Sequence, residues 1–442
     1  MASIDRGVGR LVAVLDRIVD PRIGVMSGVW ELPPDPGTPR FFHFRGTACN
    51  TKAFSCDSNF RETGGASTDR WHAMAKAVGE GVERYCGAIY DREQCALATY
   101  DEADFACVPP AHFALYGPAQ YAKRGFPYVR FESRTPVRWA ACLDPLTGET
   151  LAVPAVMIWI PYTPGPEERR ISQSISTGLC CHESHAKAAL GAVCEVIERD
   201  AFTITWQRRL AQPRIIAETL SDANYQRLAL IEASGGRVDI LDLTLDHRVT
   251  TVMSVLRSAR PESPAVVVAA ATHPSPEDAL RESLEELAHT RRYSELIKLH
   301  VPELQEAPGF EHVKSQVEHL AFWADHRRHD AIEWMFASDR RIEFGELQDL
   351  SCHDAARDLQ VVCERVAGTG HRVLLRELTT PDIADLGLAV VRAVIPGYHP
   401  LQMGHVFRAL GGERLWKLPH RLGYDIGSDP ADGDNPFPHP YP

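Results

Sequence analysis

The chain has 442 residues, of which 44% are hydrophobic and 24% are charged, and its formal net charge is −12. This balance is typical of a globular protein with a large core, and an acidic chain is a poor candidate for bulk binding of nucleic acid. Charges interrupt the helical spacing of the N-terminal residues, so they do not form a signal peptide, and no run of about 18 apolar residues could span a membrane. Eleven cysteines without a CxxC pair indicate reduced thiols, and we expect a cytoplasmic protein.

The first part of the chain predicts an N-terminal segment followed by a long helix. Residues 1–60 combine a helix, a proline-rich loop and a short strand at Phe41–Phe44. A helix is expected from about Thr68 to Ile89, because Thr68 or Asp69 can accept hydrogen bonds from its first backbone N–H groups. Residues 126–160 then alternate in the manner of strands, with Pro and Gly at the turns.

The rest of the chain mixes helices and strands without a regular βαβ order. We expect helices at about Ser184–Arg208 and Pro276–Leu299, and strands at Val238–Leu243, Ala265–Ala271 and near Ala389–Ile395. This order predicts an α+β fold. No glycine-rich phosphate loop of the Walker or Rossmann type is present, so a bound nucleotide would have to be held in another way.

The helix at 68–89 carries two neighbouring carboxylates. At about 100° per residue its apolar side chains form one stripe, and Glu80 and Glu83 project together from the other side. One interpretation is a binding site. The alternative, a solvated face with an ion pair to Lys76, is equally well supported by this helix alone.

The helix at 184–208 is stronger evidence for a binding site, because it is apolar on nearly all sides. Between Ala186 and Phe202 the only charges besides Glu195, Glu198 and Arg199 are Lys187 and Asp200. A helix of this kind is buried, and buried carboxylates are costly unless they are paired or hold a metal. We therefore favour an internal polar site over a surface cluster of ion pairs.

The two helices carry the same signature, Glu-x-x-Glu-Arg, at 80–84 and at 195–199. Four carboxylates placed together need cations, and Mg²⁺ is often bound through carboxylates and phosphate oxygens. The arginines can pair with phosphate groups. This pattern indicates an ATP–Mg²⁺ site. A third charged helix at 276–299 would, on its own, favour a solvated amphipathic face.

Several ordered motifs resemble those of the YcaO family. The resemblance covers most of the chain from about residue 60 and rests on the segments Gly79–Tyr85, Ser176–Cys180 and Glu195–Phe202. Glu286-Leu-Ala-His289-Thr-Arg291 is similar to the third nucleotide motif of that family, Glu-x-x-Gln-x-Arg. The segment Val394–Leu401 and the Pro-x-Pro-x-Pro ending resemble the azoline-forming branch.

The resemblance implies a YcaO-type fold, with mixed sheets and helices around an ATP–Mg²⁺ site and a proline-rich C-terminal tail. It implies an N-terminal segment (1–60) packed on the core, a catalytic domain (61–430) and the tail (431–442). The implied magnesium ligands are Glu80, Glu83, Glu195, Glu198 and Glu286. The implied ATP contacts are Lys76, Arg84, Ser176, Arg199, His289 and Arg291. The implied catalytic groups are Arg199 and the carboxylate of Pro442, which would act as a general base.

The function implied by the resemblance is ATP-dependent cyclodehydration of a ribosomally made precursor peptide. A Cys, Ser or Thr side chain attacks the preceding amide carbon, ATP phosphorylates the amide oxygen, and a thiazoline or oxazoline results. The implied partners are the precursor peptide, a separate leader-binding protein that resembles ubiquitin-activating enzymes, an azoline dehydrogenase and a second copy of the chain. No nucleic acid or membrane partner is expected.

The motifs depart from the family at three places. Gly64-Gly65-Ala66 stands where Gly-Lys-Gly is common, Lys76 replaces a common Ser, and His289 replaces the usual Gln. These departures affect the individual ATP contacts more than the family resemblance. Two alternatives stay open: a YcaO enzyme that forms thioamides or amidines, although the proline tail argues against thioamides, and a non-catalytic ATP-binding subunit, for which the absence of Gly-Lys-Gly argues weakly. For the tail, composition alone favours a disordered linker or a ligand for an aromatic groove over a stiff rod that reaches the active site.

Overall fold

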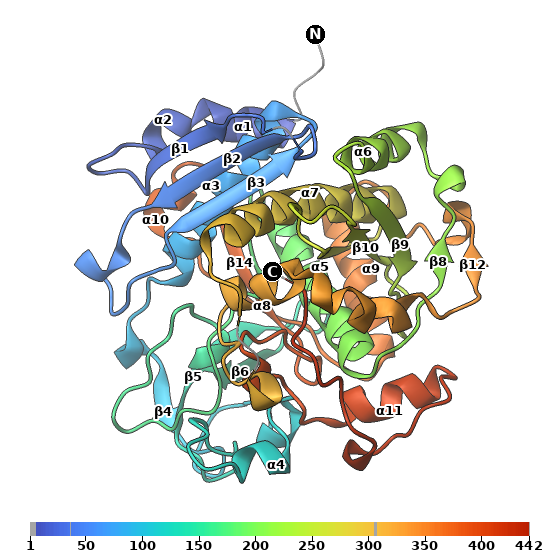
Figure 1. The fold of residues 1–442 in the computed structure, drawn as a ribbon. Helices are drawn as coiled ribbons and strands as arrows, with labels where there is room; N and C mark the ends of the chain where they lie inside the picture. The colour runs from blue at the N-terminus through green and yellow to red at the C-terminus, as the bar shows by residue number, and fades with distance from the viewer. Residues whose placement is uncertain (1–5, 36, 305–306, 442) are drawn as a thin grey trace.

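A three-stranded sheet forms one side of the molecule (Figure 1). The computed structural model describes residues 6–35, 37–304 and 307–441. The strands of this sheet are antiparallel and comprise β1 (Met26–Leu32), β2 (Phe42–Ala48) and β3 (Glu62–Ser67). Two N-terminal helices, α1 (Arg6–Ala13) and α2 (Leu15–Ile18), precede it.

A six-stranded antiparallel sheet joins distant parts of the chain, and β14 lies in it near the middle of the molecule (Figure 1). In spatial order its main path is β4 (Ala96–Ala98), β5 (Val137–Leu143), β13 (Leu374–Glu377), β14 (Ala389–Val394) and β7 (Leu179–His182). A further strand, β6 (Thr150–Pro154), pairs with β5. Residues more than 200 positions apart are therefore neighbours in this sheet.

The third sheet has five strands. Their spatial order is β11 (Val266–Thr272), β10 (Thr251–Arg257), β9 (Arg237–Asp242), β8 (Arg214–Ile215) and β12 (Arg341–Ile342). Within the described part of the chain, β8–β12 is the one parallel ladder between named strands. Sheets of this kind, mixed with helices that follow no βαβ order, confirm the α+β prediction.

Three long helices lie where the sheets meet: α3 (Arg70–Gly87), α5 (His185–Gln207) and α7 (Pro276–His300). The side chains of Asp69, Ser184 and Ser275 accept hydrogen bonds from the first N–H groups of these helices, so the predicted start points are confirmed. Helix α3 packs on β2 and β3, α5 lies between β14 and β11, and α7 covers β10 and β11 and reaches β3. The three glutamate-bearing helices therefore converge on one region.

The remaining helices are short or peripheral. They are α4 (Pro118–Tyr121), α6 (Asp222–Glu232), α8 (Gln316–Ala324), α9 (Ala355–Gly368), α10 (Pro381–Ala384) and α11 (Glu413–Arg421). Among the described helices, none is both long enough and apolar enough to cross a membrane.

The N-terminal region differs from its prediction. The strands β1 and β3 were not expected, and β3 pairs with β2 along its whole length. The predicted boundary at residue 60 therefore lies between two strands of one sheet, and the three-part division of the chain stays a prediction.

Candidate functional site

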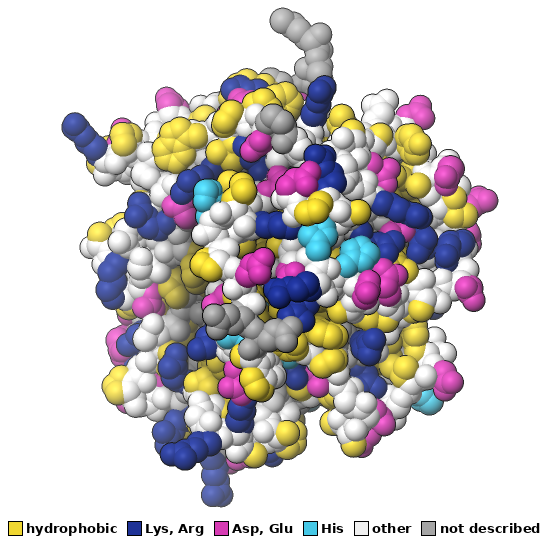
Figure 2. All heavy atoms as spheres, in the orientation of Figure 1, with side chains coloured by type: hydrophobic (Ala, Val, Ile, Leu, Met, Phe, Trp, Pro, Cys, Tyr) yellow, Lys and Arg dark blue, Asp and Glu magenta, His cyan; other side chains and the backbone are white. Residues whose placement is uncertain are grey.

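A cleft of about 1290 Å³ is lined by side chains of α3, α5 and α7. It brings together ten of the residues that the motifs singled out: Lys76, Glu80, Glu83, Arg84, Ser176, Glu195, Glu198, Arg199, Glu286 and His289. Arg291 does not line it, and Pro442 is outside the described residues. Figure 2 shows one face of the molecule, where acidic, basic and histidine side chains are interspersed near the centre.

The first glutamate of each Glu-x-x-Glu-Arg motif is held in the same way. Glu80 accepts a hydrogen bond from the backbone N–H of Gly64 at 2.9 Å, and Glu195 accepts one from Gly178 at 2.9 Å. The arginine four residues later lies beside the other carboxylate oxygen, at 3.0 Å for Arg84–Glu80 and at 3.4 Å for Arg199–Glu195. The repeated signature is therefore also a repeated geometry.

The second glutamate of each motif is more deeply enclosed. Glu83 accepts a hydrogen bond from the backbone N–H of Cys181 at 2.7 Å, and Glu198 accepts one from the hydroxyl of Tyr441 at 2.5 Å. Burial, with neighbouring carboxylates adding to it, raises the pKa of Glu83 and the pKa of Glu198 to about 8. Their charged forms are therefore unfavourable until a cation compensates them.

These donors fit a magnesium ion that is shared with phosphate groups. Among the described residues, no group of three or more His, Cys, Asp or Glu side chains is arranged to hold a metal. Mg²⁺ is usually bound through one or two carboxylates, with waters and phosphate oxygens completing its shell. Pairs of carboxylates on α3 and α5 suit this kind of binding, and the adjacent Arg84 and Arg199 suit the phosphates.

Helix α7 contributes an acid–base pair to the cleft. The Nδ1 atom of His289 lies 3.6 Å from the Oε1 atom of Glu286. Burial opposes the charge on Glu286, but His289, together with the charges of Lys76 and Arg199, outweighs it and lowers the pKa of Glu286 to about 2. The ring of His289 needs the glycine at position 64, because a Cβ atom there would lie 2.3 Å from its Nε2 atom.

Two predicted contacts need correction. The Nζ atom of Lys76 lies 2.5 Å from Glu285, which is buried on α7, so the alternative in which Lys76 pairs with the carboxylates of its own helix is wrong. Arg291 is buried away from the cleft, where its guanidinium donates to the carbonyl of Gly37 and pairs with Glu295 at 3.0 Å. Because Arg291 is buried with these partners and does not line the cleft, the structure does not support the predicted contact between Arg291 and ATP.

Among the cleft residues that the motifs did not single out, three lie beside the glutamates or contact them: Arg281, Glu282 and Tyr441. The spacing of Glu282, Glu286 and His289 places them on one face of a helix, and this signal identifies Glu282 as a companion of the motif. The guanidinium of Arg281 lies 3.0 Å from Glu282. Tyr441 comes from a distant part of the chain, and no local pattern indicates it.

A buried arginine orients the loop that carries Ser176. Arg392, on β14, donates hydrogen bonds to the carbonyls of Met157, Ile175 and Ser176 at 2.8–2.9 Å. Burial lowers the pKa of Arg392 to about 10. Because all three acceptors are backbone atoms, Arg392 fixes the course of the loop and so the place of Ser176 in the cleft.

The segment Val394–Leu401 supports α5 directly after Arg199. The backbone N–H of His399 donates to Asp200 at 2.8 Å, and the Nε atom of Arg414 donates to the other oxygen of Asp200 at 2.9 Å. Asp200 is completely buried, so these bonds compensate its burial. The segment therefore acts by holding the helix and not by lining the cleft with its own titratable groups.

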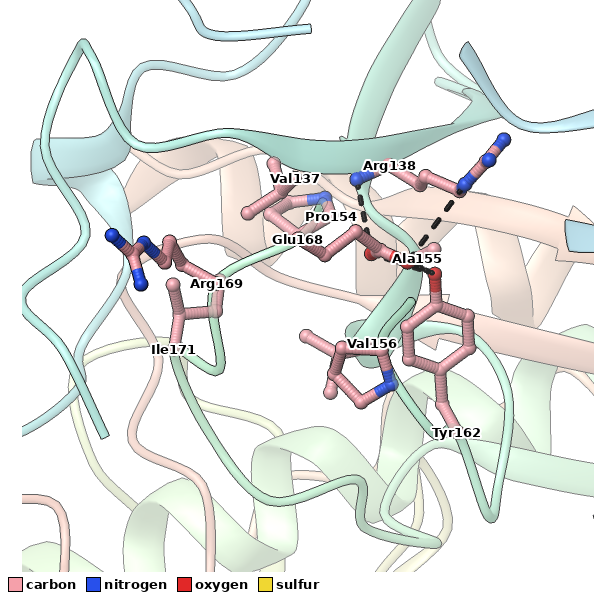
Figure 3. Close-up of a pocket in the computed structure, with 10 residues that line it drawn as sticks. Val137, Arg138, Pro154, Ala155, Val156, Tyr162, Glu168, Arg169 and Ile171 are labelled. Atoms are coloured by element: carbon pink, nitrogen blue, oxygen red, sulfur yellow. Dashed lines mark hydrogen bonds and ion pairs between the residues drawn. The ribbon is translucent and has the colours of Figure 1, made fainter. Parts of the chain in front are cut away.

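A second, small cavity of about 10 Å³ lies beside a cluster of hydrogen bonds around Glu168 (Figure 3). The carboxylate of Glu168 accepts hydrogen bonds from the Tyr162 hydroxyl at 2.8 and 3.0 Å and from backbone N–H groups of Gly165 and Arg138. The space suits about one water molecule. The hydrogen bonds to Glu168 hold the loop at 162–168, which borders the large cleft.

Fold and site together define a class of protein that binds metal and nucleotide through helix-borne carboxylates. The model of one such family, described as YcaO cyclodehydratase, ATP- and Mg²⁺-binding, matches residues 64–399. The chain belongs to the YcaO cyclodehydratase family, and ATP and Mg²⁺ are the cofactors of that family. An uncharacterized protein of Methanothermobacter thermautotrophicus is 25% identical in an alignment of 346 residues that covers 75% of this chain and 80% of that protein.

Solved structures share the fold. A heterocyclase in complex with substrate and cofactor superposes with a TM-score of 0.80 at 19% identity and covers 98% of this chain. This chain spans 57% of the length of that heterocyclase chain. The YcaO protein of Methanopyrus kandleri, bound with AMPPCP and Mg²⁺, has a TM-score of 0.63 at 20% identity, with 88% of this chain and 90% of that chain covered. These likenesses confirm the predicted YcaO-type fold.

Proposed function

We propose that this chain is an ATP-dependent cyclodehydratase that converts Cys, Ser or Thr of a ribosomally made precursor peptide into thiazoline or oxazoline. One observation carries the proposal. Two Glu-x-x-Glu-Arg helices face one cleft, and the C-terminal segment is seated against the second of them through Tyr441 and Glu198. Family membership supports the use of ATP and Mg²⁺.

The cleft residues divide into two groups in this proposal. The carboxylates of Glu80, Glu83, Glu195, Glu198 and Glu286 hold the magnesium. The groups that orient the phosphates are Lys76, Arg84, Ser176, Arg199 and His289. Bound ATP supplies a phosphoryl group that makes the amide oxygen a good leaving group. The protein then positions the peptide and the nucleotide and stabilises the charge that develops on the phosphoryl group.

The net change in the peptide is the loss of one water molecule per ring. The side-chain sulfur or oxygen bonds to the preceding carbonyl carbon and loses its proton, and the amide N–H loses its proton as the C=N bond forms. The carbonyl oxygen departs with the phosphoryl group as inorganic phosphate, while ATP becomes ADP. The carboxylate expected to accept a proton, that of Pro442, stays a prediction.

The size of the cleft supports a peptide substrate beside the nucleotide. Pockets for small ligands are about 300–1,000 Å³, and the cleft of about 1290 Å³ exceeds this range. Beyond the glutamates its wall continues with polar side chains of Arg170, Gln173 and Lys314. These groups can bond to a peptide backbone. We further propose a separate leader-binding partner, an azoline dehydrogenase and a homodimer as the assembly in which the chain works.

The decisive experiment is mass spectrometry of the precursor peptide after incubation with this protein, its partner, ATP and Mg²⁺. We expect the loss of one water mass per ring. Glu198→Gln should lower turnover by at least about a hundredfold, because the cation loses a charged ligand in the transition state. Glu364→Gln, at an exposed position on α9, is the control and should leave turnover unchanged.

Other outcomes would replace the proposal. A mass increase that matches exchange of oxygen for sulfur would identify a thioamide-forming enzyme. A peptide of unchanged mass, with no peptide-dependent ATP hydrolysis, would identify a non-catalytic ATP-binding subunit. Unchanged turnover in Glu198→Gln would contradict the assignment of the site.

A further inference from the structure

The C-terminal segment 435–441 lies in a groove of aromatic rings beside α5 and α8. Three consecutive tail carbonyls each accept a hydrogen bond from a ring N–H. Trp206 donates to Phe437 at 3.2 Å, and Trp323 donates to Pro438 at 2.8 Å. His319 donates through Nδ1 to His439 at 2.8 Å. The alternating prolines offer few N–H groups, so the groove holds the segment mainly by its carbonyls.

This groove fixes where the segment ends. Asn435 anchors its start, with its side-chain amide donating to the carbonyl of Trp206 and its own N–H donating to that of Gln207. The ring of Tyr441, which is 1% exposed, packs against Phe202 with centroids 4.6 Å apart. The guanidinium of Arg199 lies 4.4 Å from the centroid of the Tyr441 ring. Two neighbouring side chains of α5 therefore hold the ring of Tyr441 against that helix.

The hydroxyl of Tyr441 has a defined direction. It accepts a hydrogen bond from the backbone N–H of Ala270, on β11, at 3.3 Å. Its single proton has two acceptors in reach, the Oε1 atom of Glu198 at 2.5 Å and the carbonyl of Ala270 at 3.1 Å. When a bound cation keeps Glu198 in its charged form, this carboxylate attracts the proton more strongly than a carbonyl does. The backbone of β11 thus orients the hydroxyl of Tyr441, and this hydroxyl in turn holds the carboxylate of Glu198.

We propose that Tyr441 is a positioning residue for the divalent-cation site. By holding the carboxylate of Glu198, it couples the seating of the C-terminal segment to the affinity for Mg²⁺. This inference rests on the proposed role of Glu198 as a metal ligand. It assigns the segment a function in metal binding that is separate from any proton transfer by its last residue.

The test is a titration of Mg²⁺ in the presence of a fluorescent ATP analogue, with the full-length protein. Tyr441→Phe removes only the hydroxyl, and we expect it to raise the Mg²⁺ concentration for half-maximal binding about tenfold, as the loss of a hydrogen bond to a charged group implies. Nucleotide affinity at saturating Mg²⁺ should stay unchanged. Tyr90→Phe is a matched control, because the hydroxyl of Tyr90 also accepts from a backbone N–H and donates to a carboxylate, that of Asp57, at 2.7 Å.

A second comparison separates positioning from support of the fold. In a Glu198→Gln background, adding Tyr441→Phe should shift the Mg²⁺ dependence no further, because the coupled partner is already changed. An unchanged Mg²⁺ dependence in Tyr441→Phe would overturn the proposal. Weaker nucleotide binding that saturating Mg²⁺ does not restore would overturn it too. A wild-type protein that binds ATP with Mg²⁺ but makes no heterocycle would refute the proposed function and leave this test intact.

Discussion

Within each Glu-x-x-Glu-Arg motif, identical side chains have different environments. Glu80 and Glu195 each accept a backbone N–H and lie beside an arginine. Glu83 and Glu198 are enclosed, and burial raises the pKa of each. The first member of each pair is thus oriented for binding in advance, whereas the second is a carboxylate whose charge depends on the cation. Sequence spacing predicts the pairing but not this division, because the division depends on donors from β7 and from the C-terminal segment.

This division predicts that Mg²⁺ binding displaces protons. Without the cation, Glu83 and Glu198 are largely protonated at neutral pH because their pKa is about 8. In the unfolded chain a glutamate has a pKa of about 4.3. Between these values the folded protein binds more protons than the unfolded chain, so the stability of the metal-free protein falls as the pH rises through this window.

Calorimetry can check both consequences. Mg²⁺ with ATP should bind more tightly as the pH rises from about 6 to about 9, and protons should be released below about pH 8. Titrations in buffers of different ionisation enthalpy measure this release. Glu83→Gln, which cannot release the proton, should lower the number released. An affinity for Mg²⁺ that is independent of pH would contradict the raised pKa values.

At the scale of elements, the long helices were predictable and the short strands were not. The caps and apolar stripes of α3, α5 and α7 are local patterns, so their ends were predicted to within a few residues. Strand β3 reads Glu-Thr-Gly-Gly-Ala-Ser and has low strand propensity. It forms because β2 pairs with it, and its glycines admit α3 and the ring of His289. These are contacts between distant residues.

The turn before β7 shows how an element positions the site. Gly178 donates its N–H to Glu195, accepts from the N–H of Ala393 at 2.7 Å, and has a φ of +84°. A Cβ atom there would lie 2.4 Å from the carbonyl oxygen of Ala393. Gly178→Ala should therefore move the turn away from β14 and take the N–H away from Glu195.

Gly125→Ala is the matched control for this change. Gly125 has a similar φ of +83°, and a Cβ atom there meets nothing within 4 Å. Both substitutions should cost about 1–2 kcal/mol of stability for the left-handed backbone. Gly178→Ala should cost about 1–3 kcal/mol more for the clash, and it alone should weaken binding of ATP with Mg²⁺. Equal melting temperatures for the two variants would show that the close approach of residue 178 to Ala393 does not add to the loss of stability.

At the scale of the whole molecule, the C-terminal segment connects the five-stranded sheet, α5 and α8 to the cleft. Composition alone favoured a disordered linker or a ligand for an aromatic groove. Residues 435, 439 and 441 are buried, so the disordered alternative is wrong and the groove is the protein's own. The donors that hold the segment, Trp206, Trp323 and His319, lie more than 100 residues before it in the sequence. No pattern within the segment could indicate them.

The two tryptophans near this groove allow a test of the coupling. The Nε1 atom of Trp323 donates to the carbonyl of Pro438 at 2.8 Å, whereas the Nε1 atom of Trp334 has no hydrogen-bond partner among the described residues. Trp323→Phe therefore removes a bond that holds the segment, and Trp334→Phe removes an indole N–H that holds nothing described. Both changes remove a similar aromatic volume.

Hydrogen exchange of the segment around 435–441 should distinguish the two variants. Loss of one net hydrogen bond, worth about 1 kcal/mol, should speed local exchange about fivefold in Trp323→Phe and leave it nearly unchanged in Trp334→Phe. If the segment positions Glu198 through Tyr441, Trp323→Phe should also need more Mg²⁺ for half-maximal nucleotide binding, although Trp323 does not line the cleft. Faster exchange without any change in Mg²⁺ dependence would show that the segment can loosen while Tyr441 keeps its place, and it would separate the groove from the metal site.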